Sequence, residues 1–134
     1  MTLPVIVTEF RAGLAKGELL IQQCGDCGKP NMWPRYACPH CQSENLGWAE
    51  AAGTGTLHSF CVLRQGAPEG HEEDLPYAIG VVKLDEGVQI AVRLEPDASE
   101  DWSSYQCDDR VQFVAKGAAQ IEKRPCATFR RTQP

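Results

Sequence analysis

The side chains that most clearly indicate chemistry in this sequence are cysteines. Four of the seven fall as two Cys-x-x-Cys pairs separated by ten residues. Two such pairs offer four thiolates to one tetrahedral metal ion, with Zn–S distances near ~2.3 Å. Gly25 and Gly28 allow the backbone to curl around the first pair, and Pro39 starts the second. We therefore predict one structural zinc ion, held by Cys24, Cys27, Cys38 and Cys41.

Other roles for paired cysteines fit this pattern less well. A redox dithiol seldom occurs as two motifs in series, and disulfides belong to oxidising compartments. A rubredoxin-like electron carrier would hold iron with the same ligand type, but the two pairs are close together for that comparison. Four cysteine ligands leave no open coordination position, so we expect the site to be non-catalytic. Asp26 and His40 lie inside the pairs and are expected to be exposed non-ligands.

The other three cysteines form no pattern. Cys61 lies in an apolar run, where we expect a buried small side chain, whereas Cys107 and Cys126 lie near polar residues and are expected to be exposed. A nucleophilic cysteine needs a nearby base, and His58 would point to the opposite face of the strand from Cys61. The sequence also shows no Ser/His/Asp set and no phosphate-binding glycine-rich loop. We therefore expect no enzyme activity from this chain by itself.

The elements that position the four ligands are short. Thr8 is the expected N-cap of a helix that ends at Gly17. Leu19 to Ile21 then lead as a strand into the first pair, and residues 32–36 are expected to be extended. A lobe this small has little core, so bound metal would supply much of its folding free energy. We assign residues 1–45 to this helix and rubredoxin-like zinc ribbon.

From residue 46 the apolar pattern changes to that of strands. One sharply bent strand is expected over 46–63, with glycines at its bend. Residues 77–84 and 88–94 alternate between apolar and polar and flank a turn that ends in Gly87, which predicts a hairpin.

A polar loop at 65–76 precedes the hairpin, and further strands are expected at 111–115 and 119–123. Five strands with one bent strand favour a five-stranded Greek-key barrel of the OB-fold type. The predicted fold class is therefore mainly β, with an OB-fold domain over 46–134 that ends in a basic tail.

The charge distribution limits the choice of partners. The chain has 134 residues and a net charge of −5. Residues 65–109 hold two bases and twelve acids, whereas residues 110–134 hold six bases and one acid. Nucleic-acid binders usually combine a basic face with aromatic residues, and aromatic residues make up only 7% here. A nucleic-acid-binding ribbon and OB-fold module therefore remains the alternative rather than the main hypothesis.

The expected location is cytoplasmic. No stretch of the sequence approaches the ~20 apolar residues of a membrane span. The first ten residues lack the basic flank and the long apolar stretch of a secretory signal.

The order and spacing of these pieces resembles the zinc-ribbon/OB-fold family of acyl-CoA-associated proteins, long described only as a domain of unknown function. Two features depart from the family pattern. Asp108-Asp109-Arg110 stands where the family often has a glycine before its late strand, and Phe129-Arg130-Arg131 stands where a Phe-x-Pro-like ending is common. The segments that carry the likeness are 10–20, Cys24–Gly28, Pro34–Arg35, Cys38–Cys41, Trp48, 53–59 and 76–88.

The resemblance implies partnership rather than independent catalysis. Members assemble with thiolase-fold enzymes, including acyl-CoA thiolases and retro-aldol enzymes of steroid side-chain breakdown, and others pair with acyl-CoA hydratases. The partner carries the catalytic residues, while the OB-fold chain helps to form the acyl-CoA channel and the ribbon contributes to docking. The expected function is thus a non-catalytic accessory subunit of a CoA-thioester enzyme complex.

The resemblance also suggests binding residues. Basic side chains near the C-terminus would meet the phosphates of CoA, and a solvated basic tail is the competing interpretation. Trp33, Trp48 and Trp102 are candidate anchors for a partner, although internal packing explains Trp33 and Trp48 equally well. The bases are Arg110, Lys116, Lys123 and Arg124, followed by Arg130 and Arg131.

Overall fold

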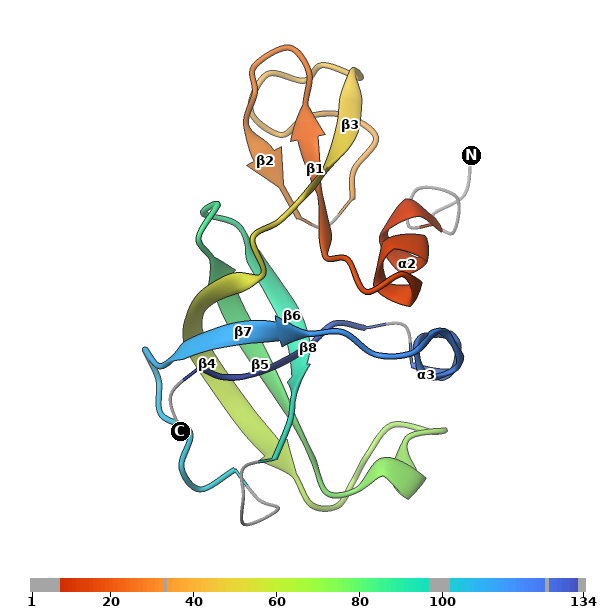
Figure 1. Cartoon of the computed structure of the whole chain (residues 1–134), viewed down its shortest axis with the longest axis vertical. Coiled ribbons are helices and arrows are strands. Elements are labelled where there is room, and N and C mark those ends of the chain that lie inside the picture. The colour runs from red at the N-terminus through yellow and green to blue at the C-terminus, as the bar shows by residue number, and fades with distance from the viewer. Residues whose placement is uncertain (1–7, 33, 97–101, 125, 133–134) are drawn as a thin grey trace.

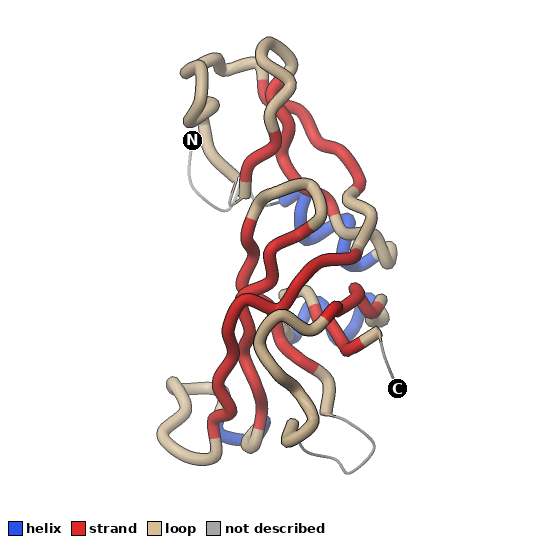
Figure 2. Tube along the Cα trace, turned by 90° about the vertical axis from the view of Figure 1, so that its left-hand side faces the viewer, coloured by secondary structure: helices blue, strands red, loops and turns tan. Residues whose placement is uncertain are grey.

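The chain forms two lobes arranged along its long axis (Figure 1). A computed structural model describes residues 8–32, 34–96, 102–124 and 126–132. A small sheet occupies one end, a barrel lies below it, and two helices lie along one side. Figure 2 shows the same elongated arrangement from the side. Within the described residues, no helix is long and apolar enough to cross a membrane.

The N-terminal helix and the first strand confirm the predicted lead into the cysteine pairs. Helix α2 covers Thr8–Ala15 and buries Phe10 and Leu14, which lie one turn apart on the same face. Gly17 ends this segment with a φ of +85°, a conformation that favours glycine. Strand β1 (Leu20–Cys24) then runs directly into the first ligand pair.

The small sheet has three antiparallel strands in the order β2-β1-β3. Strand β2 covers Pro30–Asn31 and β3 covers Leu46–Glu50. The predicted single strand over 46–63 is therefore divided, and its first part pairs with β1. Gly53, with a φ of +84°, lies at the break and redirects the chain toward the barrel.

The second lobe is a closed five-stranded barrel, as the strand pattern predicts. Its order is β4-β5-β6-β8-β7, with β6 and β8 parallel and the other pairs antiparallel. The hairpin expected around Gly87 is confirmed, and that glycine has a φ of +96°. The strands are β4 (Thr54–Leu63), β5 (Tyr77–Leu84), β6 (Gln89–Leu94), β7 (Arg110–Val114) and β8 (Thr128–Arg131).

Strand β4 bends because it pairs with two neighbours. Its first residues pair with β7, residues 55–63 pair with β5, and a register shift lies between Leu57 and Ser59. Gly55 sits at a close approach between β4 and β5. A Cβ there would lie 2.5 Å from the Lys83 carbonyl oxygen, so only glycine fits without a backbone shift.

The last elements differ from the sequence prediction. Residues expected as a strand over 119–123 form helix α3 (Ala118–Lys123), in which Ile121 is buried. The region expected to be a basic tail contains β8, which closes the barrel. Phe129 explains this difference, because it is fully buried and pairs with both Leu94 and Phe113. A short 3₁₀ helix, η1 (Glu72–Asp74), interrupts the polar loop at 65–76.

The two lobes share one apolar core. Phe10, Leu14 and Ile21 belong to the same buried cluster as Leu57 and Val82 of the barrel. The ribbon lobe therefore depends on the barrel as well as on bound metal for its stability.

Candidate metal centre and surrounding polar sites

The first cysteine pair begins at the end of β1, and the chain turns back on itself there. The backbone N–H groups of Asp26 and Cys27 each donate to Cys24 Sγ over 3.4 Å. In the second pair, the His40 N–H donates to Cys38 Sγ over 3.4 Å. Such N–H···S bonds orient the sulfur atoms and stabilise their thiolate form.

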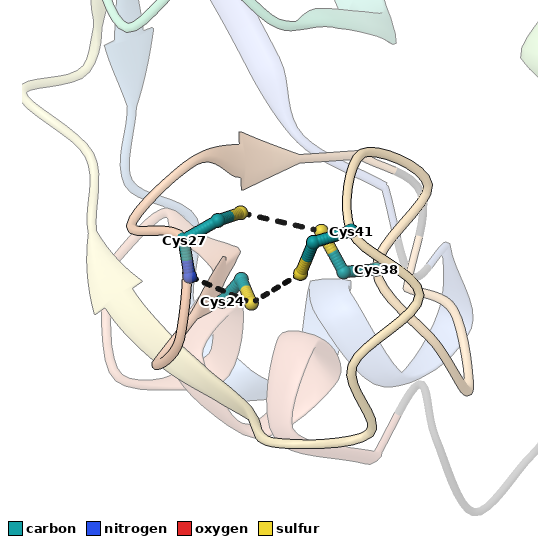
Figure 3. A group of neighbouring side chains, drawn as sticks. All are labelled: Cys24, Cys27, Cys38 and Cys41. Carbon is teal, nitrogen blue, oxygen red and sulfur yellow. Dashed lines mark hydrogen bonds between the residues drawn. The ribbon is translucent and has the colours of Figure 1, made fainter.

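All four predicted ligands meet at one point (Figure 3). Their sulfur atoms lie within 4.8 Å of one another, and the Cys24–Cys41 and Cys27–Cys38 sulfur pairs are both 3.6 Å apart. A tetrahedral zinc tetrathiolate places its sulfurs roughly 3.8 Å apart, so these residues fit the ion. In the described part of the chain, this is the one cluster of His, Cys, Asp and Glu close enough to hold a metal.

The electrostatics of the four-cysteine cluster favour the binding of a cation. The N–H of Cys27, together with that of Asp26, lowers the pKa of Cys24 to about 6. At Cys41 the Ser43 N–H favours the thiolate, but desolvation and the neighbouring thiols outweigh it and raise the pKa to about 12. Four thiolates at this distance repel one another, and a divalent cation removes that repulsion. The donor set therefore matches a structural zinc site.

The polar residues within the pairs are not part of the cysteine cluster found in the described residues. Asp26 accepts hydrogen bonds from Ser43 and Asn45, and the Ser43 hydroxyl is the main cause of its lowered pKa. Those hydrogen bonds link the first Cys-x-x-Cys pair to the residues that follow the second pair. His40 is exposed.

The remaining cysteines divide differently from the prediction. Cys61 is exposed, because its position on β4 faces away from the core; the expectation that it is buried is wrong. Cys107 is exposed as expected, whereas Cys126 is half-buried. Burial raises the pKa of Cys126, which opposes the formation of a nucleophilic thiolate there.

The candidate basic side chains do not form one patch. Lys116 and Arg124 line the same cavity of about 450 Å³, with Leu94, Trp102 and Ile121 on its apolar wall. Lys116 donates to Glu95 over 2.5 Å.

The other basic side chains lie elsewhere. Arg110 donates to Asp85 at the turn between β5 and β6. Arg131 pairs with Asp109 at 3.0 Å, and Arg130 is exposed on β8. The side chain of Lys123 lies outside the described residues.

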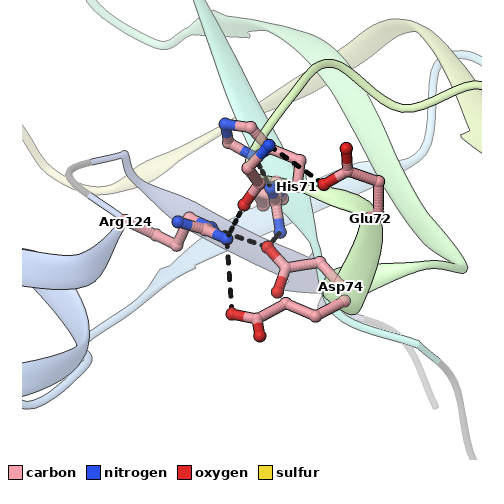
Figure 4. A network of polar contacts seen from close by, with 7 residues as sticks. His71, Glu72, Asp74 and Arg124 are labelled. Atoms are coloured by element: carbon pink, nitrogen blue, oxygen red, sulfur yellow. Dashed lines mark hydrogen bonds and ion pairs between the residues drawn. The ribbon is translucent and has the colours of Figure 1, made fainter.

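The sequence did not predict a polar network that lies beside the cavity lined by Lys116 and Arg124 (Figure 4). Arg124 donates to Asp74 over 2.7 Å and to the Gly70 carbonyl over 2.6 Å. Arg93 reaches the same Asp74 oxygen over 3.2 Å and lies 3.1 Å from His71 Nδ1. The Arg124 guanidinium is the main cause of the lowered pKa of Asp74. In the sequence, the only indication of this network is that an acidic loop and a basic segment occur 50 residues apart.

The two tryptophans in the described residues, Trp48 and Trp102, pack against the core. Trp102 is buried and donates its indole N–H to the Leu94 carbonyl over 2.8 Å, so it is not an exposed partner anchor. Trp48 is partly buried against the core. Trp33 lies outside the described residues.

A four-cysteine ribbon joined to a five-stranded barrel defines a zinc-ribbon/OB-fold protein. Two family models match the chain in that order. Residues 11–47 match the rubredoxin-like zinc ribbon domain of ChsH2, and residues 48–116 match its C-terminal OB-fold domain. The chain therefore belongs to the ChsH2 zinc-ribbon/OB-fold family, which confirms the resemblance inferred from the sequence.

Solved structures show the same architecture. A chain of the "Ltp2-ChsH2(DUF35) aldolase" is 25% identical, with a TM-score of 0.73 and 93% of both chains covered. A DUF35-family protein of unknown function from Sulfolobus solfataricus has a TM-score of 0.60 at 14% identity, which shows a shared fold. That match covers 92% of this chain and 83% of the other.

Two relatives are similar over part of the chain. A protein from Thermomonospora curvata named "Probable enoyl-CoA hydratase alpha subunit" is 36% identical over 76 residues. A "DUF35 domain-containing scaffold protein" from Methanocaldococcus jannaschii is 28% identical over 80 residues. These matches cover 57% and 59% of this chain, but only 23% and 56% of the two relatives.

Proposed function

We propose that this protein is a non-catalytic accessory subunit of a CoA-thioester enzyme complex, with a thiolase-fold enzyme as its partner. The main support is its likeness, over 93% of its length, to a chain of a structure whose name joins ChsH2 to Ltp2 in an aldolase. Within the thiolase-fold class, that name favours a retro-aldol lyase over an acyl-CoA thiolase. The hydratase-subunit and scaffold-protein relatives support the same class of role.

The metal centre supports a structural contribution to such a complex. Zinc bound by Cys24, Cys27, Cys38 and Cys41 would be fully coordinated by protein, so it would offer no position to a substrate. The ion would hold the ribbon in shape beside the barrel. Catalytic groups would then come from the partner enzyme.

The cavity beside α3 is the proposed contribution to the acyl-CoA channel. Its apolar wall suits an acyl or pantetheine chain, and Lys116 and Arg124 suit phosphate groups. Each base has a carboxylate partner, Glu95 for Lys116 and Asp74 for Arg124. CoA phosphates would therefore have to compete with these carboxylates. Arg110 is held by Asp85 at another part of the barrel, so Lys116 and Arg124 are the stronger candidates.

Co-expression with candidate thiolase-fold and hydratase enzymes tests the proposal. Size-exclusion chromatography with light scattering would detect a stable complex, and cleavage of a β-hydroxyacyl-CoA would be assayed for each protein alone and for the mixture. We expect a defined hetero-oligomer and activity that requires both chains. Acyl-CoA turnover by this chain alone, abolished by changing one of its own residues, would overturn the proposal.

The nucleic-acid alternative is tested on the same preparation. Fluorescence anisotropy with a single-stranded oligonucleotide at physiological salt would detect such binding. A salt-dependent affinity with no enzyme partner would favour the alternative.

A further inference from the structure

A second cavity lies where the ribbon meets the barrel. It has a volume of about 370 Å³ and lies between β2 and the turn that joins β5 to β6. Figure 1 shows this hairpin reaching toward the ribbon lobe. We call this cavity the junction groove, and the lining residues that matter here are Lys29, Asn31, Met32, Arg35, His40 and Glu86.

The junction groove contains a buried amide without a hydrogen-bond partner among the described residues. Asn31 is 4% exposed, yet within that part of the chain neither its Nδ2 nor its Oδ1 makes a hydrogen bond. Buried polar groups are almost always paired, because leaving them unpaired forfeits the hydrogen bonds they made to water. An unpaired donor and acceptor on one side chain are therefore unusual for a residue with a purely structural role.

The neighbouring strand shows what such an amide can do. Gln22 lies directly opposite Asn31 in the β1–β2 pair, so the two side chains project from the same face. The Gln22 amide accepts from the Arg35 backbone N–H over 2.8 Å and donates to the Arg35 carbonyl over 3.0 Å. It thus pairs with both backbone polar groups of a single residue. Asn31 carries the same donor and acceptor, and neither has a partner among the described residues.

The position of β2 leaves room for an incoming chain. Among the described residues, this strand lies at the edge of its sheet and pairs with β1 alone. Edge strands accept extended segments through main-chain hydrogen bonds. A segment beside β2 would pass along the wall that carries Asn31.

The charges around the groove indicate what kind of segment fits. Lys29 and Arg35 contribute exposed cationic side chains on the ribbon wall. On the hairpin wall, Glu86 Oε2 accepts from the Ala52 N–H over 2.8 Å, while its buried Oε1 has no partner within the described part of the chain. A peptide backbone supplies N–H groups for Glu86 and Asn31 and a carbonyl for the Asn31 Nδ2, and an acidic side chain would complement the two cations.

We propose that the junction groove binds an extended, acidic segment of the partner enzyme, with the backbone N–H and C=O of one residue of that segment paired to the Asn31 amide. This inference rests on the proposed function, since it names where the partner docks. Solvent does not reach the Asn31 amide in the free chain. Docking therefore includes a shift of a flexible lining side chain such as Met32.

The variant Asn31→Leu separates docking from folding. Leucine has a similar shape and removes both unpaired polar atoms, so the free chain should be as stable as the wild type or more stable. Affinity for the partner enzyme should fall about tenfold or more, because two hydrogen bonds are lost from the complex. Thermal unfolding of the free chain and calorimetric titration with the purified partner measure the two effects.

A charge reversal provides the second variant. Arg35→Glu should weaken the complex by a factor that shrinks as salt is raised, because an acidic segment would then face a like charge. Arg64→Glu, at an exposed position just beyond β4, is the matched control and should bind as the wild type does.

The outcomes distinguish this inference from the proposed function. A stable, weakly binding Asn31→Leu chain supports docking in the groove. A complex that forms equally well with this variant overturns the inference and leaves the accessory role intact, and a destabilised free chain also overturns it. Binding of ADP that disappears in Asn31→Leu would instead define a nucleotide site. If the wild-type chain forms no complex at all, the proposed function fails, and the docking inference fails with it.

Discussion

Arg110 on β7 donates to both carboxylate oxygens of Asp85, over 2.9 and 3.0 Å, and so ties β7 to the turn between β5 and β6. Asp85 also accepts from the Thr54 hydroxyl over 2.5 Å. Three barrel strands therefore converge on one carboxylate. Arg110, which the family resemblance suggested as a ligand of CoA phosphates, therefore has a structural partner within the chain.

This cluster predicts a pH dependence of stability. The Arg110 hydrogen bonds, followed by that of Thr54, lower the pKa of Asp85 to about 2. A lowered pKa in the folded state contributes stability above the unfolded value near 3.8, and this contribution is lost as the pH falls toward about 2. The wild type should therefore exceed Asp85→Asn in stability at pH 6, and the gap should narrow between about pH 4 and pH 2.

Urea unfolding of both proteins across that pH range measures the effect. The exposed residue Glu69 provides the control. Glu69→Gln should follow the wild-type profile. If the free energies of unfolding of the wild type and Asp85→Asn differed by a constant amount from pH 6 to pH 2, the lowered pKa of Asp85 would be contradicted.

The close approach of β5 to Gly55 predicts that one added methyl group at this position lowers the free energy of unfolding. Gly55→Ala would place a Cβ 2.5 Å from the Lys83 carbonyl oxygen and 2.8 Å from Val82. We expect a loss of roughly 1–3 kcal/mol in the free energy of unfolding, as for other overpacked sites. Gly47→Ala is the matched control, because its nearest neighbour would be 3.9 Å away. Equal stability of the two variants, measured by chemical denaturation, would argue against the described β4–β5 packing.

The left-handed backbone at Asp108 predicts a stabilising substitution. Its φ is +73°, a conformation that costs most residues about 1–2 kcal/mol and costs glycine little. Asp108→Gly should therefore raise the free energy of unfolding by roughly 0.5–1 kcal/mol, whereas Asp108→Ala should lower it. Denaturant midpoints of the three proteins provide the test, and a stable alanine variant would rule out this backbone strain.

The metal centre predicts lobe-specific unfolding. Cys24→Ser removes one of four ligands, so zinc should be lost and the ribbon should unfold while the barrel strands stay largely intact. Cys61→Ser, which changes an exposed cysteine on β4, should retain one zinc per chain. Metal analysis and hydrogen exchange of β1–β3 against β4–β8 report the two outcomes. Retained zinc with unchanged thermal stability in Cys24→Ser would count against the site.

The parts of the fold that depend on local pattern could be predicted from the sequence. Strand alternation and Gly87 define the β5–β6 hairpin, and β5 has the predicted bounds of Tyr77–Leu84. The spacing of Cys24 and its three partners alone indicates the metal site. In both cases the residues that carry the signal lie close together in the chain.

The parts that depend on long-range contacts could not be predicted. Residues 119–123 form a helix instead of a strand, because the closing strand is supplied by Phe129 and its neighbours. The Arg124–Asp74 pair joins residues 50 positions apart, and no local pattern indicates it. The unpaired amide of Asn31 likewise depends on what the barrel hairpin places beside β2.

The most direct test of the central claim is a tagged purification of this protein from its native host, with mass spectrometry and metal analysis of the same sample. We expect one zinc per chain and a near-stoichiometric thiolase-fold enzyme. Zinc with bound nucleic acid and no enzyme partner would exclude the accessory-subunit role.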